Sequence, residues 1–595
     1  MTELFEAADA FDARLALGAT GVLRDFNLAG VLTAADVHVA LRVGRLTGEA
    51  DPTVLLAVAL ATRAVRHGSV CVDLATVAVV APDLAWPSPE RWVAAIEGSP
   101  LLSAGVVCWE SGLLYLHRYW QQEVQLVADL RERLDQPAPP VDDPVLEAGV
   151  ERVFAGVTYD EQRTAVLRAA RQWTTVLTGG PGTGKTTTVA GLLSLLTEQA
   201  AVAGLPPLRI AMTAPTGRAA ARLQEAVVES ASELPSADRA RLVGLEAVTL
   251  HRLLGTRRDN STRFRHHRGN RLPHDVVVVD ESSMVSLTMM TRLVEAVRPD
   301  ARLVLVGDPD QLASVEAGAV LSDLVGGLSR TEGSPVVRLH TTHRYGAAIG
   351  RLAAAVRDGS EDDVLEVLRS GAAEGGRCAV AEERSGAPEV ALVETDEPAA
   401  FLRPALLEAA LSLRGHALAG REQEALNAME GHRLLCAHRD GPFGVRHWNR
   451  QVEHWLAEAS GDPLYEPMYV GRPLLVTVND YGLGVHNGDV GAVVMTREGP
   501  RAIVAGARGR ASFATSRMSD VETMFATTIH KSQGSQVDHV TVLLPPPESR
   551  LLTRELFYTA VTRARKTVRV VGTEESVRAA VARRAQRASG LRQRL

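Results

Sequence analysis

The stretch from Gly179 to Thr186, GGPGTGKT, has the residue types and spacing to bind the phosphates of a nucleotide. It matches the pattern G-x-x-x-x-G-K-[S/T] and lies between an apolar segment that predicts a strand, Thr174–Thr178, and a helical stretch. Glycines let consecutive backbone N–H groups turn toward a phosphate chain, and the start of a helix adds partial positive charge. The residues predicted to bind the nucleotide here are Gly179, Gly180, Pro181, Gly182, Thr183, Gly184, Lys185, Thr186 and Thr187.

The lysine of this stretch is one of three in a chain of 595 residues with 64 basic residues; the others are Lys531 and Lys566. A compact, mobile ammonium suits a glycine cradle that a planar guanidinium would not fit in the same way. We therefore expect Lys185 to bridge the terminal phosphates and the hydroxyl of Thr186 to hold Mg²⁺. Lys566 has no role that its spacing predicts, and we interpret it as a solvated charge at a helix end.

Two further strand ends carry side chains suited to nucleotide hydrolysis. VVVVDESSM, Val276–Met284, is an apolar strand that ends in two carboxylates. Asp280 could bind Mg²⁺ through water, and Glu281 could polarise the attacking water. LVLVGDPDQLASV, Leu303–Val315, is another strand before a polar loop, in which Gln311 could contact the γ-phosphate. Together these segments predict the hydrolysis of a nucleoside triphosphate with Mg²⁺.

The composition, with 46% hydrophobic and 23% charged residues, is typical of a globular protein of roughly three to four domains. No apolar run reaches about 18 residues, so no membrane span is expected. The acidic N-terminus argues against a secretory signal. The four cysteines lie far apart, which argues against a disulfide framework and a metal-binding pair. These features favour a cytoplasmic location.

The excess of negative charge lies in the first 140 residues, which carry 10 arginines against 17 acidic residues. Such a surface disfavours phosphate contacts and favours a protein partner. Apolar periodicity over residues 32–67 and 92–134 predicts that this part is mainly helical. A proline-rich segment, Leu134–Pro144, predicts a linker after it.

Strands and helices alternate after the linker, which predicts parallel α/β lobes. Between Arg472 and Ala526 the pattern changes to short alternating runs separated by turn-forming stretches, His486–Asp489, Arg497–Pro500 and Ala507–Arg510, which predicts a small inserted β-barrel. Besides the strands named above, predicted strands are Arg209–Thr213, Val337–Leu339, Arg433–Cys436, Pro473–Thr477 and His539–Leu543.

The order of the motifs resembles that of the superfamily 1 DNA helicases. TYDEQRTAV (158–166) is similar to their adenine-reading segment, TAPTGRAA (213–220) to their first DNA-contact loop, and GDPDQL to their third motif. TTHRYG (341–346), TTIHKSQGSQ (527–536) and ELFYTAVTRARK (555–566) resemble their later motifs. The resemblance therefore extends from residue 158 to residue 566.

This resemblance implies roles that spacing alone does not. Gln162 would read adenine, Arg344 would act as an arginine finger, and Arg563 would place a guanidinium on the γ-phosphate from a second lobe. The residues expected to take part in catalysis are thus Lys185, Glu281, Gln311, Arg344 and Arg563.

The resemblance also implies the fold: an α/β protein with two RecA-like P-loop lobes, small inserted β subdomains and an α-helical N-terminal domain. We expect a partner-binding domain over residues 1–140. A first lobe is expected over 145–345, with a basic hairpin insert at about 255–272. A second lobe is expected over 346–595, with the β-barrel insert at about 478–525.

The segment His251–Arg271 carries seven arginines and one acidic residue, with Phe264 and three histidines interleaved. Arginines with an interleaved aromatic ring suit single-stranded DNA, through phosphate pairing and base stacking. Contact with a partner subunit is the open alternative. From this segment and from the resembling motifs, the residues expected to contact DNA are Thr213, Pro215, Thr216, Arg263, Phe264, Arg265, Arg268, Thr528, His530 and Lys531. His530 and Lys531, with Gln533, would face either the DNA backbone or the cleft.

Within the superfamily, the chain most resembles the RecD family, through GGPGTGKTTTVAGLL, Cys436–Arg450 and Gly471–Gly491. This resemblance implies an ATP- and Mg²⁺-dependent helicase that moves 5′ to 3′ on single-stranded DNA. It also implies a heterotrimer with RecB and RecC, exodeoxyribonuclease V, that unwinds duplex DNA from broken ends for repair. No lysine has an acid two residues before it, so we expect the nuclease to lie in a partner subunit.

Three alternatives remain open at this point. A stand-alone RecD-like helicase is disfavoured by the acidic N-terminal part, which lacks a tandem helix–hairpin–helix pattern. A structural subunit with a decayed ATPase is disfavoured by the intact Lys185, Asp280, Glu281, Arg344 and Arg563. A relaxase-type helicase is disfavoured because no nicking domain is visible upstream.

Overall fold

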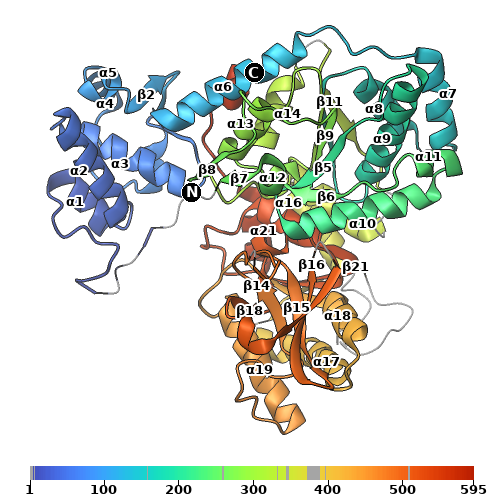
Figure 1. Cartoon of the computed structure of the whole chain (residues 1–595). Helices are drawn as coiled ribbons and strands as arrows, with labels where there is room; N and C mark the ends of the chain where they lie inside the picture. The colour runs from blue at the N-terminus through green and yellow to red at the C-terminus, as the bar shows by residue number, and fades with distance from the viewer. Residues whose placement is uncertain are drawn as a thin grey trace.

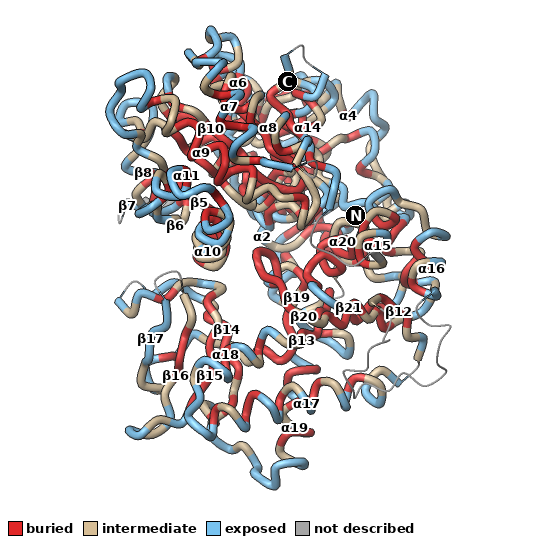
Figure 2. Tube along the Cα trace, turned by 90° about the vertical axis from the view of Figure 1, so that its right-hand side faces the viewer, coloured by how far each residue is buried: buried red, intermediate tan, exposed pale blue. Residues whose placement is uncertain are grey.

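The computed structural model spans residues 1–595 and describes all of them except 1–3, 6, 8, 157–158, 258–259, 331–332, 343–346, 371–388, 396, 481 and 507–508. The chain folds into an N-terminal domain, a first lobe and a second lobe with an inserted sheet (Figure 1). Buried residues fill the interiors of both lobes (Figure 2). No helix of the described residues is long and apolar enough to cross a membrane.

The N-terminal domain combines helices with a small antiparallel sheet of order β1-β3-β2. The domain is therefore mainly helical, as predicted, with a small sheet that the apolar periodicity did not indicate. Ser111 and Gly112 have φ values of 51° and 80°, which form a tight turn between two short apolar runs and favour a hairpin over a helix. Its elements are α1 (Gly21–Leu28), α2 (Ala34–Thr47), α3 (Pro52–Arg66), β1 (Cys71–Asp73), α4 (Pro89–Glu97), α5 (Pro100–Ser103), β2 (Val107–Glu110), β3 (Leu113–Leu116) and α6 (His117–Leu134).

The first lobe is built on a parallel sheet of order β11-β4-β10-β9-β5-β6. Its strands are near-continuous apolar runs because helices cover both faces. Alternate residues of β9 and β10 enter two different cores, one shared with α13 and α14 and the other with α8, α9 and α10. The strands are β4 (Thr174–Gly179), β5 (Ile210–Ala214), β6 (Ala247–Thr249), β9 (Val276–Val279), β10 (Arg302–Gly307) and β11 (Val336–Leu339). The helices are α7 (Asp143–Val153), α8 (Asp160–Ala170), α9 (Lys185–Val202), α10 (Gly217–Glu233), α11 (Ser236–Ala240), α12 (Leu250–Leu254), α13 (Leu287–Ala296) and α14 (Val320–Leu328).

This strand order places the predicted site at one edge of the sheet. β10 pairs in parallel with β4 on one side and with β9 on the other. The carboxyl ends of these three strands therefore meet, and each continues into one of the predicted nucleotide-site segments. Such a crevice beyond the carboxyl ends is the usual ligand position in open parallel sheets.

The second lobe carries another parallel sheet, of order β12-β21-β20-β13-β19. β21 spans Ala564–Val571, so Lys566 lies in a strand and not at a helix end as predicted. Its ammonium pairs with the Asp538 carboxylate at 2.8 Å. The other strands are β12 (Val390–Val393), β13 (His432–Cys436), β19 (Ala526–Thr528) and β20 (Val537–Leu543), and the helices are α15 (Ala347–Asp358), α16 (Glu361–Ser370), α17 (Pro398–Leu418), α18 (Glu422–Gly431), α19 (Val445–Ser460), α20 (Arg554–Val561) and α21 (Glu574–Ala582).

The inserted sheet is antiparallel, with the order β17-β16-β15-β14-β18. Its ends, β17 and β18, do not pair with each other in the described part of the chain, so the insert is an open sheet and not the predicted closed barrel. It begins at β14, within the stretch Arg472–Ala526 and before the expected boundary at about 478, because β14 pairs with β15 and β18 and not with the parallel sheet. The strands are β14 (Pro473–Val476), β15 (Val490–Thr496), β16 (Gly499–Gly506), β17 (Gly509–Ala514) and β18 (Val521–Thr523).

The C-terminal end of the second lobe's sequence range differs from the predicted three-part division. The basic segment forms the predicted hairpin within the first lobe, β7 (Thr256–Arg257) with β8 (Asn260–Phe264). After α21, however, residues 583–595 leave the second lobe and end in α22 (Leu591–Arg594), which packs against the first lobe. The predicted second-lobe boundary at 595 is therefore wrong. Helix α6 likewise shares the first lobe's core, through Leu126 and Leu130.

A buried arginine joins the end of α6 to the first lobe. The Arg133 guanidinium is 4% exposed and donates hydrogen bonds to the carbonyls of Trp173, Arg298 and Ala301 and to the hydroxyl of Thr174. These acceptors lie in the segments that lead into β4 and β10. The guanidinium therefore fixes the start of the two strands that carry the predicted site.

We expect Arg133→Met to keep the packing of the aliphatic stem but to leave buried carbonyls without donors. The free energy of unfolding of the first lobe should fall by about 3 kcal/mol. Urea unfolding followed by tryptophan fluorescence measures this change. Glu132→Met, at the exposed neighbouring position, is the control. Equal stability of the two variants would contradict the anchoring role of Arg133.

Candidate functional site

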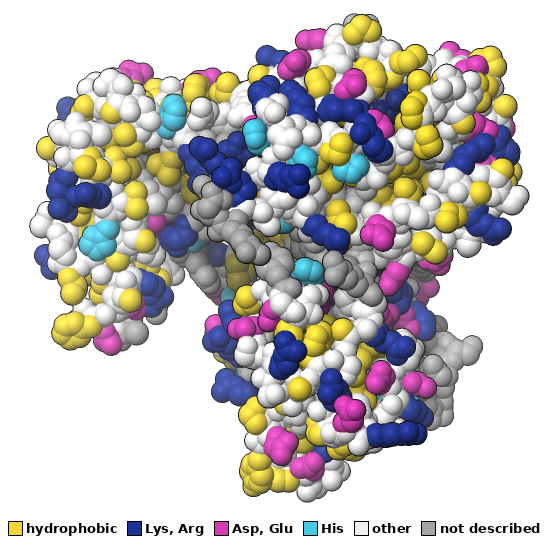
Figure 3. Space-filling view, viewed as in Figure 1, with side chains coloured by type: hydrophobic (Ala, Val, Ile, Leu, Met, Phe, Trp, Pro, Cys, Tyr) yellow, Lys and Arg dark blue, Asp and Glu magenta, His cyan; other side chains and the backbone are white. Residues whose placement is uncertain are grey.

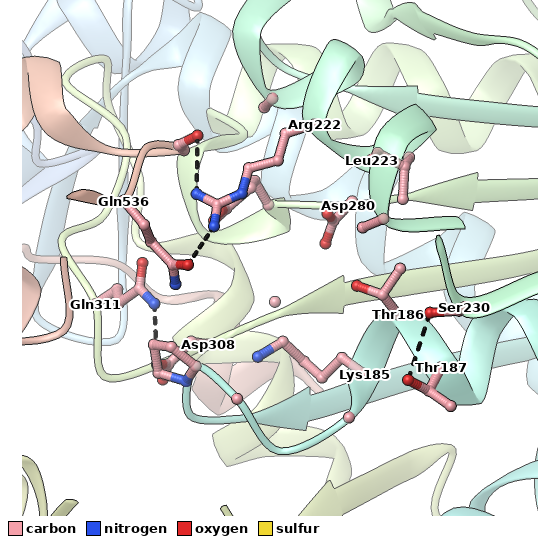
Figure 4. A pocket seen from close by; sticks show the side chains of 18 of the residues that line it. Lys185, Thr186, Thr187, Arg222, Leu223, Ser230, Asp280, Asp308, Gln311 and Gln536 are labelled. Carbon is pink, nitrogen blue, oxygen red and sulfur yellow. Dashed lines mark hydrogen bonds between the residues drawn. The ribbon is translucent and has the colours of Figure 1, made fainter. Parts of the chain in front are cut away.

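A cavity of about 330 Å³ lies between the two lobes at the predicted site (Figure 4). The first lobe contributes the loop before α9, one face of α10, and the loops after β9 and β10. The second lobe contributes a loop residue, Gly534, and the side chains of Gln536 and Arg563. The predicted residues that line the cavity are Pro181, Gly182, Gly184, Lys185, Thr186, Thr187, Asp280, Glu281, Gln311 and Arg563.

The glycines of the loop are required by its geometry. Gly182 and Gly184 have φ values of 81° and 82°, in the region that favours glycine. A Cβ atom at Gly179 would lie 2.6 Å from the hydroxyl of Thr183 and 2.8 Å from the carbonyl oxygen of Leu339. The backbone can therefore curl tightly before α9, with the helix N-terminus facing the cavity.

Lys185 extends from the first turn of α9 into the cavity (Figure 4). Its ammonium donates hydrogen bonds to the carbonyls of Gly179, at 2.6 Å, and Gly180, at 2.8 Å. Burial lowers the pKa of this ammonium, and the nearby carboxylates of Asp308 and Asp280 oppose that shift. The group is thus a partly buried cation held over the glycine loop, where it could exchange two carbonyl contacts for phosphate oxygens.

Gln162 lies behind the glycine loop and is 1% exposed. Its side-chain amide donates to the carbonyl of Thr183 at 3.0 Å, while its side-chain oxygen has no hydrogen-bond partner among the described residues. A buried acceptor without a donor is costly, so a ligand amino group would find a ready partner there. This geometry is compatible with the adenine-reading role that the resemblance implies.

The two carboxylates after β9 lie in contrasting backbone positions. The Asp280 amide donates to the carbonyl of Thr213 at 2.8 Å, which continues the sheet. Burial, and next the adjacent Glu281 carboxylate, raise the pKa of Asp280 to about 6. Glu281 has φ 48° and ψ 42°, a left-handed conformation that is strained for a residue with a side chain. Strain of this kind at a cavity wall is typical of a functional residue.

The donor set fits a bound Mg²⁺. The hydroxyl of Thr186 and the carboxylate of Asp280 both line the cavity, and both are the oxygen ligands that Mg²⁺ prefers. Mg²⁺ usually takes only one or two protein ligands and completes its shell with water and substrate phosphates. A cation here would also offset the burial that disfavours the charged form of Asp280.

The loop after β10 joins the lobes through a buried carboxylate. Asp308 is 2% exposed and accepts hydrogen bonds from the side-chain amide of Gln311, at 3.1 Å, and from the hydroxyl of Tyr558 in α20, at 3.0 Å. Next along the loop, the Leu312 amide donates to the Thr559 hydroxyl at 2.9 Å, and its carbonyl accepts from the Gln533 side chain at 2.7 Å. Gln311 therefore sits where both lobes meet the cavity.

A second bridge crosses the cavity on its far side. The guanidinium of Arg222, in α10, donates to the side-chain oxygen of Gln536 and to the carbonyl of Gly534 at 3.4 Å (Figure 4). Both acceptors belong to the second lobe. Sliding or opening of the lobes would break these contacts together with those of Asp308.

Arg563 faces the cavity from the second lobe and is 3% exposed. Its guanidinium donates to the carbonyls of Thr559, at 3.0 Å, and Ser535, at 3.2 Å, and its charge contributes to the lowered pKa of Lys185. Arg344 lies outside the described residues. The segment just before it is tied to the first lobe, because the Glu161 carboxylate accepts from the amides of His340 and Thr341 at 2.7 Å and 3.1 Å.

The structure corrects two of the predicted DNA contacts. Thr213 is fully buried at the end of β5, and Phe264 is 5% exposed within the first lobe's core, so neither side chain is presented to a strand of DNA. Phe264 instead packs edge-on against the His251 ring, with 5.9 Å between ring centroids. Composition alone could not tell which face of the hairpin this ring occupies.

The remaining predicted contacts lie at or near the surface. Pro215, Thr216, Thr528 and His530 are half-buried, and the Thr216 hydroxyl caps α10 by accepting from the Ala219 amide. Lys531 is exposed, and its ammonium pairs with the Glu522 carboxylate at 2.9 Å. Lys531 therefore has a partner within the chain, which a DNA phosphate would have to replace.

The basic hairpin presents its arginines outward. Arg257, Arg263, Arg265 and Arg268 are exposed, and dark blue side chains gather where the hairpin meets the N-terminal domain (Figure 3). Arg268 forms an ion pair with the Asp129 carboxylate of α6. Arg268 thus serves the contact between the hairpin and α6, whereas no side-chain hydrogen bond or ion pair involving Arg263 or Arg265 is seen among the described residues.

Sequence reasoning missed four residues at this site: Arg222, Asp308, Gln536 and Tyr558. The signal for Arg222 was present, because Ala219, Arg222, Ala226 and Ser230 follow helical spacing and all line the cavity. Asp308 follows a predicted strand, as Asp280 does, and could have been found by the same reasoning. Nothing in the local sequence of Tyr558 predicts that it reaches the other lobe.

Comparison with known proteins agrees with this geometry. Residues 162–317 match a family model described as AAA domain, residues 523–571 one described as UvrD-like helicase C-terminal domain, and residues 28–114 one described as RecBCD enzyme subunit RecD, N-terminal domain. The chain is similar to the RecBCD enzyme subunit RecD of Mycobacterium tuberculosis, with 57% identity over 591 residues that cover 98% of each chain.

More distant similarities were also found. The chain is 29% identical to the ATP-dependent RecD2 DNA helicase of Deinococcus radiodurans, over 82% of this chain and 59% of that protein. Among solved structures, it is similar to the Pif1 helicase from Bacteroides in complex with ADP-AlF3 and single-stranded DNA, with TM-score 0.38 and 16% identity over 71% of this chain and 94% of that one.

We expect Tyr558→Phe to keep the packing of the ring and to remove one donor from the buried Asp308 carboxylate. Loss of a hydrogen bond to a charged acceptor should shift the lobes toward opening by roughly tenfold in the closing equilibrium. Fluorescence energy transfer between dyes on the two lobes, titrated with ATP analogue, measures this shift. Tyr465→Phe, which changes an 88% exposed ring, is the control. A closing equilibrium that does not change in Tyr558→Phe would show that the Asp308 contact does not hold the lobes together.

Proposed function

Since the chain belongs to the RecD family of RecBCD enzyme subunits, we propose that it is the ATP-dependent DNA helicase subunit of a complex with RecB and RecC. In this role it moves 5′ to 3′ on single-stranded DNA and unwinds duplex DNA from broken ends in the cytoplasm. The observation that carries the proposal is the match to RecD of Mycobacterium tuberculosis over 98% of both chains. The cavity between two lobes supplies the place where ATP would act.

The second candidate function is that of a stand-alone helicase. The similarity to the Deinococcus RecD2 helicase favours it. That match is weaker and leaves a large part of RecD2 unmatched, since it covers 59% of that protein. The match to the N-terminal domain of RecD, over residues 28–114, instead favours a subunit. Co-purification with RecB and RecC separates the two, because a stand-alone helicase would elute alone and still unwind 5′-tailed duplexes.

In the proposed mechanism, the amides of the loop before α9 and the Lys185 ammonium hold the phosphates of ATP. Bound Mg²⁺, held by Thr186 and Asp280, would neutralise charge on the phosphate oxygens. Glu281 orients and polarises the attacking water, and Gln311 contacts the terminal phosphate. Each of these groups is placed by a strand end of one sheet, so their spacing is fixed before ATP binds.

The second lobe completes this site. Arg563 is buried beside the cavity and would exchange its carbonyl contacts for the γ-phosphate as charge develops there. Arg344 is proposed to add a second guanidinium. Because chemistry requires groups from both lobes, hydrolysis is coupled to closing, and the contacts of Asp308 and Arg222 break when the lobes part. If the lobes grip DNA with different strength in the two states, the cycle produces directional movement.

We propose that single-stranded DNA passes the start of α10 and the loop that carries His530 and Lys531. The outward arginines of the hairpin would meet its phosphates. Base stacking on Phe264 is not part of this proposal, because that ring is buried. Phosphate pairing without base readout is expected for a motor that must move on any sequence.

We expect Lys185→Gln to abolish DNA-stimulated ATP turnover, because the substitution removes the ammonium that faces the terminal phosphates. Folding and DNA binding should remain. Turnover with saturating single-stranded DNA, together with a thermal melt, tests this. Lys566→Gln is the matched control, since that lysine is 61% exposed and pairs with Asp538 away from the cavity. Turnover retained by Lys185→Gln would overturn the site assignment.

For the hairpin, we expect the double substitution Arg263→Glu and Arg265→Glu to weaken DNA binding and to flatten its salt dependence. Each lost phosphate contact reduces the slope of log K against log salt by about 0.7 on single strands. Arg268→Glu should instead loosen the hairpin from α6, because Arg268 pairs with Asp129. Binding titrations at several salt concentrations measure the slopes. An affinity unaffected by the double substitution would assign the hairpin to a partner contact.

A further inference from the structure

The last thirteen residues, 583–595, form a segment that we call the tail. It leaves the second lobe after α21 and runs to α6 and the first lobe, where the C-terminus lies (Figure 1). Near its start, the Ala585 amide donates to the Glu555 carboxylate at 2.8 Å, which holds it to α20. Further on, Leu591 is 1% exposed within the first lobe's core. The tail therefore links the two lobes outside the cavity.

One side chain of the tail reaches the loop that carries Gln311. The guanidinium of Arg587 donates hydrogen bonds to the carbonyl of Ser314 and to that of Glu316, the latter at 3.0 Å. The same loop contacts the second lobe six and two residues before Ser314, through Asp308 and Leu312. Arg587 thus holds the far end of a loop whose near end lies in the cavity.

The loop in turn supports the strained Glu281. The Ser314 amide donates to the carbonyl of Ser283 at 3.1 Å, and Ser283 lies in the short 3₁₀ turn that begins directly after Glu281. Ser314 itself is 6% exposed, so water can hardly replace the hydrogen-bond partners of its backbone groups. Two hydrogen bonds therefore connect Arg587 through Ser314 to Ser283, which lies two residues along the chain from Glu281, the residue proposed to polarise the water.

Arg587 sits where the three parts of the molecule meet. A Cβ atom at Gly68, in the turn after α3, would lie 2.8 Å from its guanidinium nitrogen, so the guanidinium packs closely against this turn. The Gly68 carbonyl also accepts from the Gly318 amide at 2.9 Å, which fixes the end of the same loop. On the second lobe, burial, and next the nearby Arg587, lower the pKa of His530.

We infer that Arg587 is a positioning residue for ATP hydrolysis, which acts by fixing the loop from Asp308 to Glu316 against the turn that follows Glu281. It does not touch the nucleotide. Its carbonyl contacts orient Gln311 and Glu281 from outside the cavity, and they tie that orientation to the N-terminal domain at Gly68. The inference rests on the proposed ATPase function of the cavity.

The tail is anchored well enough for Arg587 to be changed by itself. The Ser589 hydroxyl and Gly590 amide donate to the buried Glu123 carboxylate at 2.8 Å and 3.2 Å. The Arg594 guanidinium pairs with Glu110 at 2.7 Å. Removal of the Arg587 side chain should therefore leave the tail in place and free only the loop.

The test compares Arg587→Ala, Arg587→Lys and the control Arg584→Ala in the full-length chain. Arg584 is an exposed arginine three residues earlier on the tail. ATP turnover is measured with saturating single-stranded DNA, and the turnover that remains in Lys185→Gln is subtracted. We expect Arg587→Ala to lower kcat about tenfold, as small misplacements of catalytic groups do, with less than about a threefold change in KM for ATP.

Lysine carries three donors and can reach both carbonyls, so Arg587→Lys should restore kcat to within about threefold. Hydrogen exchange gives a second readout, because the Ser314 amide should lose protection in Arg587→Ala and regain it in Arg587→Lys. A kcat for Arg587→Ala equal to that of Arg584→Ala would overturn the inference. So would equal losses in Arg587→Ala and Arg587→Lys with a lowered melting temperature, which indicate a merely structural role.

Failure of this inference and failure of the proposed function are distinguishable. If Lys185→Gln has the same turnover as the unaltered chain, the cavity is not the ATPase site and the proposed function fails. If Lys185→Gln is inactive while Arg587→Ala is fully active, the function stands and only the positioning role is lost.

Discussion

The hydrogen bond from Tyr558 to Asp308 is the contact on which the arrangement of the two lobes depends. A carboxylate that is 2% exposed is costly to bury unless donors surround it, and here the donors come from both lobes. Parting the lobes removes one of them and opens the carboxylate to water. The same movement breaks the contacts of Leu312 with Thr559 and Gln533. Because these hydrogen bonds lie beside the cavity, the cavity opens when the contacts between the two lobes break.

The charges of the cavity are arranged for a ligand that carries several negative charges. Burial lowers the pKa of Lys185 and raises that of Asp280 to about 6, so each charged group is held at a cost. Arg563 adds a second cation from the other lobe. A triphosphate with its metal ion would supply opposite charge to all three groups. Since the groups are already in place, little reorganisation is needed when charge develops during hydrolysis.

The sequence predicted the fold class and the strand ends around the cavity, but it did not predict every element. Parallel strands that are buried on both faces are continuous apolar runs in the sequence. The sequence therefore predicted β4, β9 and β10, together with the polar residues at their ends. β21 was missed because Arg565, Lys566 and Arg569 interrupt its apolar pattern. The contacts of Tyr558 and Arg587 could not be predicted, because each joins segments more than 200 residues apart in the sequence. The periodicity of apolar residues describes one helix or strand at a time. It carries no information on contacts between residues far apart in the sequence.

Some of the excess acidic residues of the N-terminal domain form ion pairs within the chain and are not available to a partner. Glu110 and Glu123 hold Arg594 of the tail, and Asp129 holds Arg268 of the hairpin. The domain therefore contacts both the segment that supports the Gln311 loop and the hairpin proposed to meet DNA. A partner that binds this domain would act on two parts of the motor at once. The contacts that join this domain to the Gln311 loop pass through Gly68 and the tail and lie outside the cavity.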